Sequence, residues 1–436
     1  MPKNTTIAAI DIGTGKVCTL IAIVEEGGEL RVVGASSVQS QGIRKSQIVN
    51  LEEATAAITE SVDAAERMAG FSISRAYVSV SGKHIESQNS KGVVAIADPQ
   101  GDIIREDIDR VIEAARAISL PSNREILHVV PTSYKVDSQE GIKDPIGMSG
   151  VRLEAETHII TGSSTVLKNI RKSVESLGIQ VAEFVFSGLA SAHSVLNETE
   201  QELGVAVLDI GAGSSAISVF AEGSLMFSTV IPVGALHITK DIALGSRVSI
   251  PSAEKIKVAL SHMAPETPSR LPKETREDAR KRKKQEDQLD LHQLGLTDET
   301  HYLSRSTLTD GIIAPRLREI FELVDAELKR EKLRSDIPAG LILTGGGADT
   351  VGIIDVAKKT VNLPARVGKP IGLRGLIDEI ETPMYATATG LLLFAHETGQ
   401  WSAVKESSFS LGSLAPKINS ESLIEGVKKL LKMFMP

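Results

Sequence analysis

The chain has little cysteine and few aromatic residues. It contains one cysteine, Cys18, among 436 residues, and aromatic residues make up 3%. One cysteine cannot form an intramolecular disulfide, which fits a reducing cytosol. The scarcity of aromatic residues predicts an aliphatic core and argues against a base-stacking surface for single-stranded nucleic acid.

The sequence also lacks a long uncharged apolar run. No stretch approaches the roughly 18 residues of a membrane span, and Asp11 interrupts the apolar N-terminal run, unlike in a signal peptide. The net charge of −8 predicts repulsion of nucleic acid, so attraction to an anionic surface requires a local basic patch. The length allows more than one core, because single cores stop growing at roughly 250–300 residues.

One short motif occurs twice. Apolar β-branched runs flank Asp11–Gly15, which reads Asp-Ile-Gly-Thr-Gly, and Asp209–Gly213, which reads Asp-Ile-Gly-Ala-Gly. Each copy predicts two strands joined by a glycine turn, and a single copy is weak evidence of any function. The repeat predicts two similar lobes, with one glycine hairpin from each lobe at a shared cleft.

The residue types in these hairpins suit a metal-bound triphosphate. Glycines let backbone N–H groups approach phosphate oxygens closely. Asp11 and Asp209 would each point a hard oxygen ligand toward Mg²⁺, through water. We expect phosphate contacts from eight hairpin residues: Gly13, Thr14, Gly15, Lys16, Gly211, Ala212, Gly213 and Ser214.

A third glycine segment, Leu343–Ala348, follows a predicted buried strand and reads Leu-Thr-Gly-Gly-Gly-Ala. We expect Gly345, Gly346 and Gly347 to bring flat backbone against a nucleoside, ahead of a helix beginning near Asp349. The Walker phosphate-binding pattern is absent, because Gly13–Lys16 lacks the four-residue spacer and the following Ser or Thr.

Together these segments resemble the two phosphate motifs and the adenosine motif of the actin, Hsp70 and sugar-kinase superfamily. Ser187–Leu196 and Tyr385–Leu393 resemble its two connecting helices, whose small residues allow close crossing. Ala253–Lys257 resembles its ribose and adenine segment, which adds Glu254 and Lys257; the residues alone show an ordinary helical charge pair. The resemblance implies an α/β, actin-like (ribonuclease H-like) two-lobed ATPase fold that binds ATP and Mg²⁺.

Within the superfamily, the chain resembles the FtsA family of bacterial cell-division proteins over nearly its whole length. The likeness rests on four segments: Gly82–Glu86, His128–Pro131, Gly141–Gly147 and Ser149–Leu153. They match the inserted subdomain of that family, which serves in filament contacts and in contacts with later division proteins. The residues alone predict an inserted α/β unit.

The motifs and the resemblance imply an order of subdomains along the chain. We expect actin-like subdomain 1A at 1–83, 163–196 and, with the second connecting helix, 381–398; inserted SHS2-like subdomain 1C at 84–162; subdomain 2A at 197–232 and 315–380; and subdomain 2B at 233–314. A flexible linker at 399–421 and an amphipathic membrane-targeting helix at 422–436 follow. Within 2B, the alternating charges of Lys273–Asp287 predict a solvated helix or a flexible excursion.

Local patterns predict several further elements. Helices are expected over Leu51–Met68, Asp107–Ile118, Thr165–Leu177 and Pro315–Lys332. Short strands are expected over Ile126–Val130, Tyr134–Val136 and His158–Ile160.

The last residues predict a helix with one apolar and one basic face. The apolar residues are Leu423, Ile424, Val427, Leu430, Leu431 and Phe434, and the basic ones are Lys428, Lys429 and Lys432. Such a helix on a flexible linker can lie in the headgroup plane of an anionic membrane. Docking on the body or on a partner is the alternative, and the resemblance favours the membrane.

The resemblance also implies a partner surface. Pro315–Glu319 is similar to the family segment that reaches the C-terminal peptide of FtsZ, the tubulin-like GTPase of the division ring. Arg316 and Glu319 are therefore implied to bind this peptide, with a solvated helix face as the alternative.

The start of the first connecting helix argues against fast ATP hydrolysis. Active relatives often have Gln, Glu or Asp there to position water, whereas this chain has Ser187 and Gly188, with Glu183 four residues earlier. We expect a scaffold without catalytic residues that polymerises at the inner membrane, anchors the FtsZ ring at the septum and recruits later division proteins. An ATP-hydrolysing enzyme, chaperone-like or kinase-like, and a pilus-assembly actin homologue are the alternatives.

Overall fold

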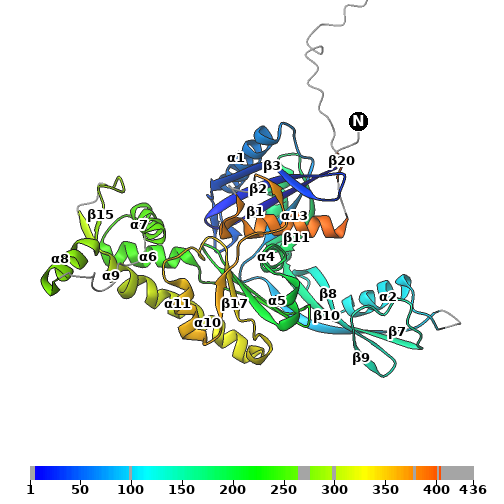
Figure 1. The fold of residues 1–436 in the computed structure, drawn as a ribbon. Helices are drawn as coiled ribbons and strands as arrows, with labels where there is room; N and C mark the ends of the chain where they lie inside the picture. Colours follow the sequence, from blue (N-terminus) through cyan, green and yellow to red (C-terminus); the bar gives the residue numbers. More distant parts are fainter. Residues whose placement is uncertain are drawn as a thin grey trace, which may run out of the picture. The chain divides into compact units, whose positions relative to one another are not determined.

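Figure 1 shows the computed structural model, which describes residues 5–97, 101–263, 275–296, 301–376, 380–399 and 402–403. The helix expected over 422–436 and most of the expected linker lie outside the described residues. No described helix has both the length and the hydropathy of a membrane span.

Two sheets repeat one topology. In the first, β1 (Thr5–Ile12), β2 (Lys16–Val24) and β3 (Leu30–Gln39) form an antiparallel meander, which β6 (Arg75–Val80) and β11 (Gln180–Phe186) extend in parallel from β1. In the second, β12 (Val205–Ile210), β13 (Ser215–Ala221) and β14 (Ser224–Ile231) form the meander, extended by β17 (Leu341–Thr344) and β18 (Ala365–Val367). The strand orders β11-β6-β1-β2-β3 and β18-β17-β12-β13-β14 correspond, so the predicted duplication is confirmed. We call the two halves lobe 1 and lobe 2.

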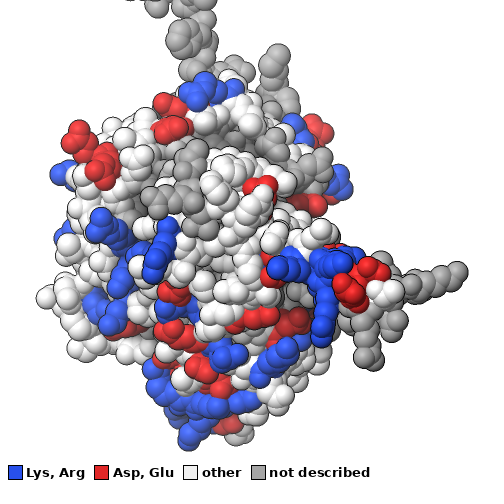
Figure 2. Space-filling model, turned by 90° about the vertical axis from the view of Figure 1, so that its left-hand side faces the viewer, with Lys and Arg blue, Asp and Glu red and all other residues white. Residues whose placement is uncertain are grey.

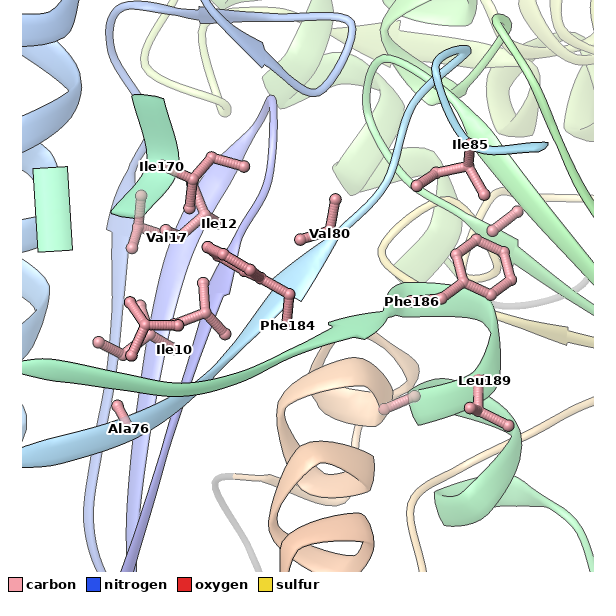
Figure 3. Close-up of a cluster of buried hydrophobic side chains, with 14 of the residues drawn as sticks. Ile10, Ile12, Val17, Ala76, Val80, Ile85, Ile170, Phe184, Phe186 and Leu189 are labelled. Carbon is pink, nitrogen blue, oxygen red and sulfur yellow. The ribbon is translucent and has the colours of Figure 1, made fainter. Parts of the chain in front are cut away.

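The apolar sequences of the strands fit their position, because helices cover the sheets and bury the side chains. All six residues of β12 are buried, as expected where both faces of a sheet are packed. In lobe 1 the core is aliphatic with Phe184 and Phe186 added, and Figure 3 shows Phe184 beside the strands that carry Ile10 and Val80. Phe186 and Leu189 extend this cluster past the end of β11. The hairpins at the strand ends are therefore anchored by fully packed strands.

The two connecting helices are α4 (Ser187–Val195) and α13 (Ala386–Thr398), which lie against each other (Figure 1). At the crossing, a Cβ on Gly390 would lie 1.6 Å from the carbonyl oxygen of Ala190. Only glycine allows this approach, so the structure confirms the close crossing that the small residues predicted.

The insert leaves lobe 1 after β6 and returns to it at α3 (Ser164–Glu175). It contains one sheet of order β7-β10-β8-β9, from β7 (Glu86–Ala95), β10 (Arg152–Ser163), β8 (Arg124–Val136) and β9 (Gln139–Ile142), with α2 (Arg105–Arg116) packed on it. Two strands predicted at 126–130 and 134–136 are wrong as separate elements, because β8 continues through Pro131 with only a register shift opposite it. The sequence analysis did not predict β7, because most of its residues are polar and exposed and it therefore lacks an apolar run.

In lobe 2, the short helix α5 (Glu198–Leu203) precedes the meander, and the other helices follow the meander or β17. These are α6 (Ala235–Ser246), α7 (Ile250–His262), α8 (Arg276–Glu286), α9 (Arg305–Leu308), α10 (Ala314–Arg330) and α11 (Ile353–Val361). A small ladder of β15 (Gln288–Asp290) and β16 (Tyr302–Ser304) follows α8, and a π-helical turn, Thr309–Ile313, precedes α10. Figure 2, which views the side of the molecule where α8 lies, shows basic and acidic side chains close together.

The charged excursion was expected to be a solvated helix or a flexible segment, and its described part confirms the helix: in α8, the N-cap Thr275 accepts a hydrogen bond from the backbone of Asp278.

Three predicted boundaries differ from the structure by more than two residues. The strand expected over His158–Ile160 is part of the longer β10, which also includes polar residues on both sides of that apolar run. The helix expected near Asp349 begins at Ile353, because the glycine segment continues as turns as far as Gly352, which has a φ of +76°. The linker was expected to include Ser402, but Ser402–Ala403 (β20) pairs with Thr5 and Thr6 at the open start of β1.

Candidate nucleotide site between the two hairpins

The two glycine hairpins touch each other. A Cβ on Gly15 would lie 2.8 Å from the Cβ of Ala212, and a Cβ on Gly213 would lie 2.7 Å from the hydroxyl of Thr14. Each turn closes with one backbone bond, from Gly13 N–H to Lys16 in the first and from Gly211 N–H to Ser214 in the second. The structure thus brings together the eight residues expected to contact phosphate.

A third loop from lobe 1 reaches across both hairpins. It joins β4 (Ile43–Arg44) to β5 (Gln47–Ile48), and its Lys45 and Ser46 have φ values of 48° and 61°. The backbone N–H of Ser46 donates to the Thr14 hydroxyl at 2.8 Å, and the Ser46 hydroxyl lies 3.0 Å from that of Ser214. Ser46 therefore links the first hairpin to the second.

Asp11 ends its strand beside a serine of the same lobe. Ser79 on β6 donates its hydroxyl to the Asp11 carboxylate at 2.6 Å and accepts the backbone N–H of Ile12 at 3.0 Å. Burial raises the pKa of Asp11, while Lys16 and the Ser79 hydrogen bond act in the opposite direction. The carboxylate is thus held in place but poorly compensated.

Asp209 takes its partner from the second connecting helix. The Thr387 hydroxyl on α13 donates to Asp209 at 3.0 Å, and a Cβ on Gly345 would lie 2.3 Å from the other carboxylate oxygen. Burial and, to a smaller extent, the negative charge of Asp11 raise the pKa of Asp209 to about 7, against the effects of Thr387 and Lys16. Two buried carboxylates that interact electrostatically favour a cation between or beside them.

Lys16 is the cation that interacts electrostatically with both carboxylates of this cluster. Its ammonium donates to the carbonyl of Met384 and lies 4.5 Å from the ring centroid of Tyr385. It lowers the pKa values of both Asp11 and Asp209. Lys16 thus connects the first hairpin to the segment that leads into α13.

The third glycine segment joins the same cluster. Gly347 N–H donates to the carbonyl of Ile210 at 2.8 Å, and Gly345 N–H donates to the carbonyl of Pro383 at 3.0 Å. Around Gly346 only the Cβ of Met384 lies within 4 Å of an added Cβ, at 3.9 Å. The segment is therefore packed against the second hairpin at its ends and open at its centre.

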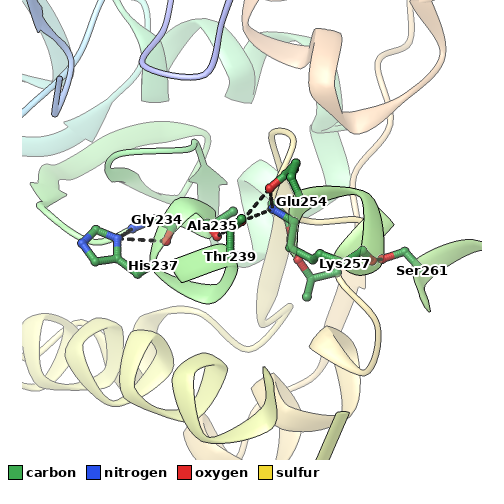
Figure 4. A network of polar contacts seen from close by, with 9 residues as sticks. Gly234, Ala235, His237, Thr239, Glu254, Lys257 and Ser261 are labelled. Atoms are coloured by element: carbon green, nitrogen blue, oxygen red, sulfur yellow. Dashed lines mark hydrogen bonds and ion pairs between the residues drawn. The ribbon is translucent and has the colours of Figure 1, made fainter. Parts of the chain in front are cut away.

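Glu254 and Lys257 lie on α7 and are tied to α6, as Figure 4 shows. The Lys257 ammonium lies 2.8 Å from Glu254 and 3.0 Å from the Thr239 hydroxyl, which donates to Glu254 at 2.5 Å. Lys257 is 7% exposed, so its stem belongs to the packing of lobe 2. Near the end of α7, burial raises the pKa of Asp349, while the charges of His262 and Lys369 act in the opposite direction.

The cluster suits Mg²⁺ that arrives with a nucleotide. The described residues contain no group of three or more His, Cys, Asp or Glu side chains arranged to hold a metal ion. Two carboxylates are what Mg²⁺ commonly takes from a protein when phosphates and waters complete its shell. The donor set at Asp11 and Asp209 fits that pattern.

Arg316 and Glu319 lie on α10, away from the hairpins, and are paired. The Arg316 guanidinium binds both oxygens of Asp241 on α6, at 2.6 Å and 3.1 Å, and also contacts Glu319. A carboxylate of a partner would therefore have to replace Asp241.

Sequence reasoning missed Ser46, Ser79 and Thr387. Thr387 lies within the small-residue segment Tyr385–Leu393, which was noticed for its close crossing and not for its hydroxyl. Ser79 is the next-to-last residue of the buried strand β6. Ser46 carries no signal in the sequence. Glu183, considered for water positioning, has its carboxylate 3.8 Å from the His128 ring, and burial raises its pKa.

Two family models match the chain. The model described as the SHS2 domain inserted in FtsA matches residues 82–161, and the model described as cell division protein FtsA matches residues 206–390.

Curated relatives match over nearly the whole length. The chain is 37% identical to cell division protein FtsA of Pseudomonas aeruginosa, covering 93% of each chain. It is 39% identical to the Borreliella burgdorferi protein of that name, covering 94% of this chain and 95% of the other. For the Escherichia coli K12 protein the identity is 35%, with 95% and 96% covered.

Solved structures share the fold at low identity. A chain of the PilM–PilN type IV pilus biogenesis complex is 14% identical, with a TM-score of 0.60, over 91% of this chain and 99% of that one. MreB5 of Spiroplasma citri bound to AMPPNP is 12% identical, with a TM-score of 0.52, over 91% and 98%. These likenesses show the fold alone.

Proposed function

This chain belongs to the FtsA family of cell-division proteins, and we propose that it is an ATP-binding scaffold that links the division ring to the membrane. It is an actin-like cell-division protein. We propose that it also binds a nucleotide, assembles with itself, and binds both the membrane and a partner in the division ring.

The observation that carries the proposal is the contact between the two hairpins. Gly15 meets Ala212 and Gly213 meets Thr14, with Asp11 and Asp209 electrostatically coupled behind them. Backbone N–H groups of both turns, together with Lys16, supply positive potential where phosphates would lie. MreB5 of Spiroplasma citri, which shares the fold, binds AMPPNP, and this supports a nucleotide as the ligand of this chain.

In this proposal, different residues around the cluster bind the metal ion, the phosphates and the nucleoside. Asp11 and Asp209 hold the waters of Mg²⁺, and Lys16 exchanges the Met384 carbonyl for a phosphate oxygen. Gly345, Gly346 and Gly347 face the nucleoside, and Glu254 and Lys257 bind it from α7. Bound Mg²⁺ would supply positive charge against the negative charge of the phosphates.

We propose slow or negligible ATP turnover. The helix α4 begins with Ser187 and Gly188, which have no acidic or amide side chain, and the Glu183 carboxylate lies 3.8 Å from the His128 ring in the insert. Without a positioned group to orient water, the nucleotide acts as a ligand that sets the arrangement of the lobes.

The membrane and the ring partner are proposed from the sequence. The helix expected over 422–436, with Lys428, Lys429 and Lys432, would hold the assembled protein on the cytoplasmic side of an anionic inner membrane, and each lysine contributes about 1 kcal/mol. Filaments of the chain would add avidity. Arg316 and Glu319 would bind the acidic C-terminal peptide of FtsZ after Asp241 is displaced.

A titration with a fluorescent ATP analogue tests the nucleotide proposal. We expect Mg²⁺-dependent binding by the wild-type chain, weakened in Asp209→Asn, and an ATPase rate well below about 1 per second. A rate on the order of 1–10 per second would favour the enzyme alternative. Absence of binding at millimolar nucleotide would reject the proposal.

Vesicle co-sedimentation and peptide affinity test the other two parts. Removing residues 422–436, or replacing Leu430 and Phe434 by Glu, should abolish sedimentation with anionic vesicles. Arg316→Glu should abolish binding of the FtsZ peptide, with Arg318→Glu on the same helix as the control. Unchanged binding in either variant would remove that assignment.

A further inference from the structure

One turn beside the hairpins comes from neither glycine motif. β4 and β5 pair through Ile43 and Ile48, and we call the turn between these strands, Lys45–Ser46, the β4–β5 turn. The backbone N–H of Ser40, before β4, donates to the carbonyl of Gly15 at 3.2 Å. Ile43 is buried in the core of lobe 1. The β4–β5 turn is therefore held at a fixed place beside the first hairpin.

The backbone of the β4–β5 turn is unusual. Lys45 and Ser46 have φ values of 48° and 61°, in the left-handed region that residues other than glycine seldom adopt. Behind the turn, a Cβ on Gly82 would lie 3.2 Å from the Lys45 carbonyl oxygen and 3.3 Å from the Ser46 Cβ, so the segment before β7 packs closely against it. Such a conformation persists where the surrounding structure holds it in place, and it is often found at ligand sites.

Three hydroxyl groups meet at this turn, one from each of three loops. Ser46 N–H donates to the Thr14 hydroxyl at 2.8 Å, and the Ser46 hydroxyl lies 3.0 Å from that of Ser214. The two serines use one hydrogen for this bond. In the part of the chain that the structure describes, the hydroxyl hydrogens of Thr14 and of the other serine have no acceptor. The cluster therefore has two O–H donors available to a ligand.

A phosphate group fits these donors. Phosphate oxygens accept hydrogen bonds, and those of an ionised phosphate form strong ones. Lys45, in the same turn, adds a positive charge. A phosphate bound here would lie beside the hairpin tips rather than between them, because the approach of Gly15 to Ala212 leaves no room for one.

The place of the cluster indicates which phosphate it would bind. The glycine segment proposed for the nucleoside meets the second hairpin at the end of β12, where a Cβ on Gly345 would lie 2.3 Å from the Asp209 carboxylate. Ser46 meets the same hairpin after its turn, at Ser214. The two contacts thus lie on opposite sides of the glycine turn, which puts Ser46 at the end of the phosphate chain far from the nucleoside.

We propose that Ser46 is a further binding residue of the nucleotide site and that its hydroxyl selects a nucleoside triphosphate over a diphosphate. The hydroxyl donates to the terminal phosphate, together with those of Thr14 and Ser214. Rotation of the O–H bonds is enough for this, so the backbone of the β4–β5 turn keeps its conformation. The inference deepens the proposed function and rests on it, because it concerns the ligand preference of the same site.

Affinities for a triphosphate and a diphosphate test the inference. The full chain and its Ser46→Ala variant are titrated, with Mg²⁺, with AMPPNP, which resists hydrolysis, and with ADP. We expect Ser46→Ala to weaken AMPPNP binding about three- to tenfold, the contribution of one hydrogen bond, and ADP binding by less than about twofold. Equal losses for the two nucleotides would mean that Ser46 only supports the hairpins, and would overturn the inference.

Ser46→Gly separates the hydroxyl from the backbone. Glycine adopts the left-handed conformation without strain, so this variant removes the hydroxyl and keeps the N–H that donates to Thr14. It should show the same change of preference as Ser46→Ala, and a wild-type preference would contradict the inference. Ser36→Ala is the control, because the Ser36 hydroxyl on β3 donates to the carbonyl of Ser61 at 2.6 Å within lobe 1. Its ratio of the two affinities should equal that of the wild type.

Beryllium fluoride gives an independent readout, because it takes the place of a terminal phosphate beside bound ADP. It should tighten ADP binding to the wild type more than to Ser46→Ala, by about threefold or more. A gain of the same size in both would overturn the inference and leave the proposed function standing. If the wild-type chain binds neither AMPPNP nor ADP, the proposed function fails, and the inference fails with it.

Discussion

The two hairpins share a motif but differ in what supports them. The first is held within its own lobe, because Ser79 binds both Asp11 and the backbone of Ile12. The second depends on Thr387, which lies on the helix α13 that packs against β1 of lobe 1. The position after the glycines is Lys16 in the first hairpin and Ser214 in the second.

This difference shows how a duplicated motif becomes asymmetric. The first hairpin contributes the charge and a fixed carboxylate. The second contributes the carboxylate whose surroundings belong to both lobes, and whose pKa responds to Asp11. A movement of the lobes and a charged ligand would therefore both change the surroundings of the Asp209 carboxylate.

The largest expected difference is in pH dependence. The pKa of Asp209 is raised to about 7 in the folded chain, above its unfolded value near 3.8, so the folded state binds the proton more tightly. Without nucleotide or Mg²⁺, the free energy of unfolding should fall as pH rises from about 4 to about 7, by at most about 1.4 kcal/mol per pH unit. Urea unfolding between pH 5 and 7.5 measures this slope.

Asp209→Asn should reduce that slope, and the part that remains comes from Asp11, whose pKa is also raised by burial. Asp11→Asn should shift the slope to lower pH, because it removes a negative charge that raises the pKa of Asp209. An unchanged slope in Asp209→Asn would mean that another group causes it.

The second contrast is between Lys16 and Ser214. Lys16→Ala should weaken nucleotide affinity about 10- to 100-fold, because hydrogen bonds to charged groups contribute about 1.5–3 kcal/mol. Ser214→Ala should weaken it no more than about fivefold. Titration with the fluorescent analogue measures both, and similar losses would show that the hairpins share the phosphate charge equally.

The third contrast is between the Ser79 hydroxyl, which supports Asp11, and the Thr387 hydroxyl, which supports Asp209. Ser79→Ala leaves a buried N–H and a carboxylate oxygen without their partner and should cost about 2 kcal/mol of stability. Thr387→Val removes one hydrogen bond with little change of shape and should cost about 1 kcal/mol. Urea midpoints decide the order, and a larger loss in Thr387→Val would reverse the comparison.

The smallest effect tests the contact between hairpins. Gly15→Ala places a methyl group 2.8 Å from Ala212 and should lower stability by about 1 kcal/mol while separating the turns. Gly27→Ala, where an added Cβ meets nothing within 4 Å, is the matched control. Thermal melts compare them, and equal melting temperatures would mean that the hairpins do not press together.

Much of the fold followed from patterns that are local in the sequence. The buried strands before Asp11 and Asp209, the helix at Leu51 and the small residues near Gly390 all have a period or composition that predicts their structure. Strand β7 was missed because it contains few apolar residues, and the split of β8 was wrong because Pro131–Ser133 interrupts the apolar pattern without ending the strand.

For the site, the sequence by itself determined the two glycine turns, the carboxylates that precede them and the glycine segment after β17, since backbone approach and charge are properties of the residues themselves. Only the tertiary structure decided that Ser79, Thr387 and Ser46 support these turns. It also decided that Arg316 pairs with the Asp241 carboxylate and that the insert contacts β14. These contacts join residues far apart in the chain, and a hydrogen bond between them depends on how the helices and sheets pack, which no local pattern encodes.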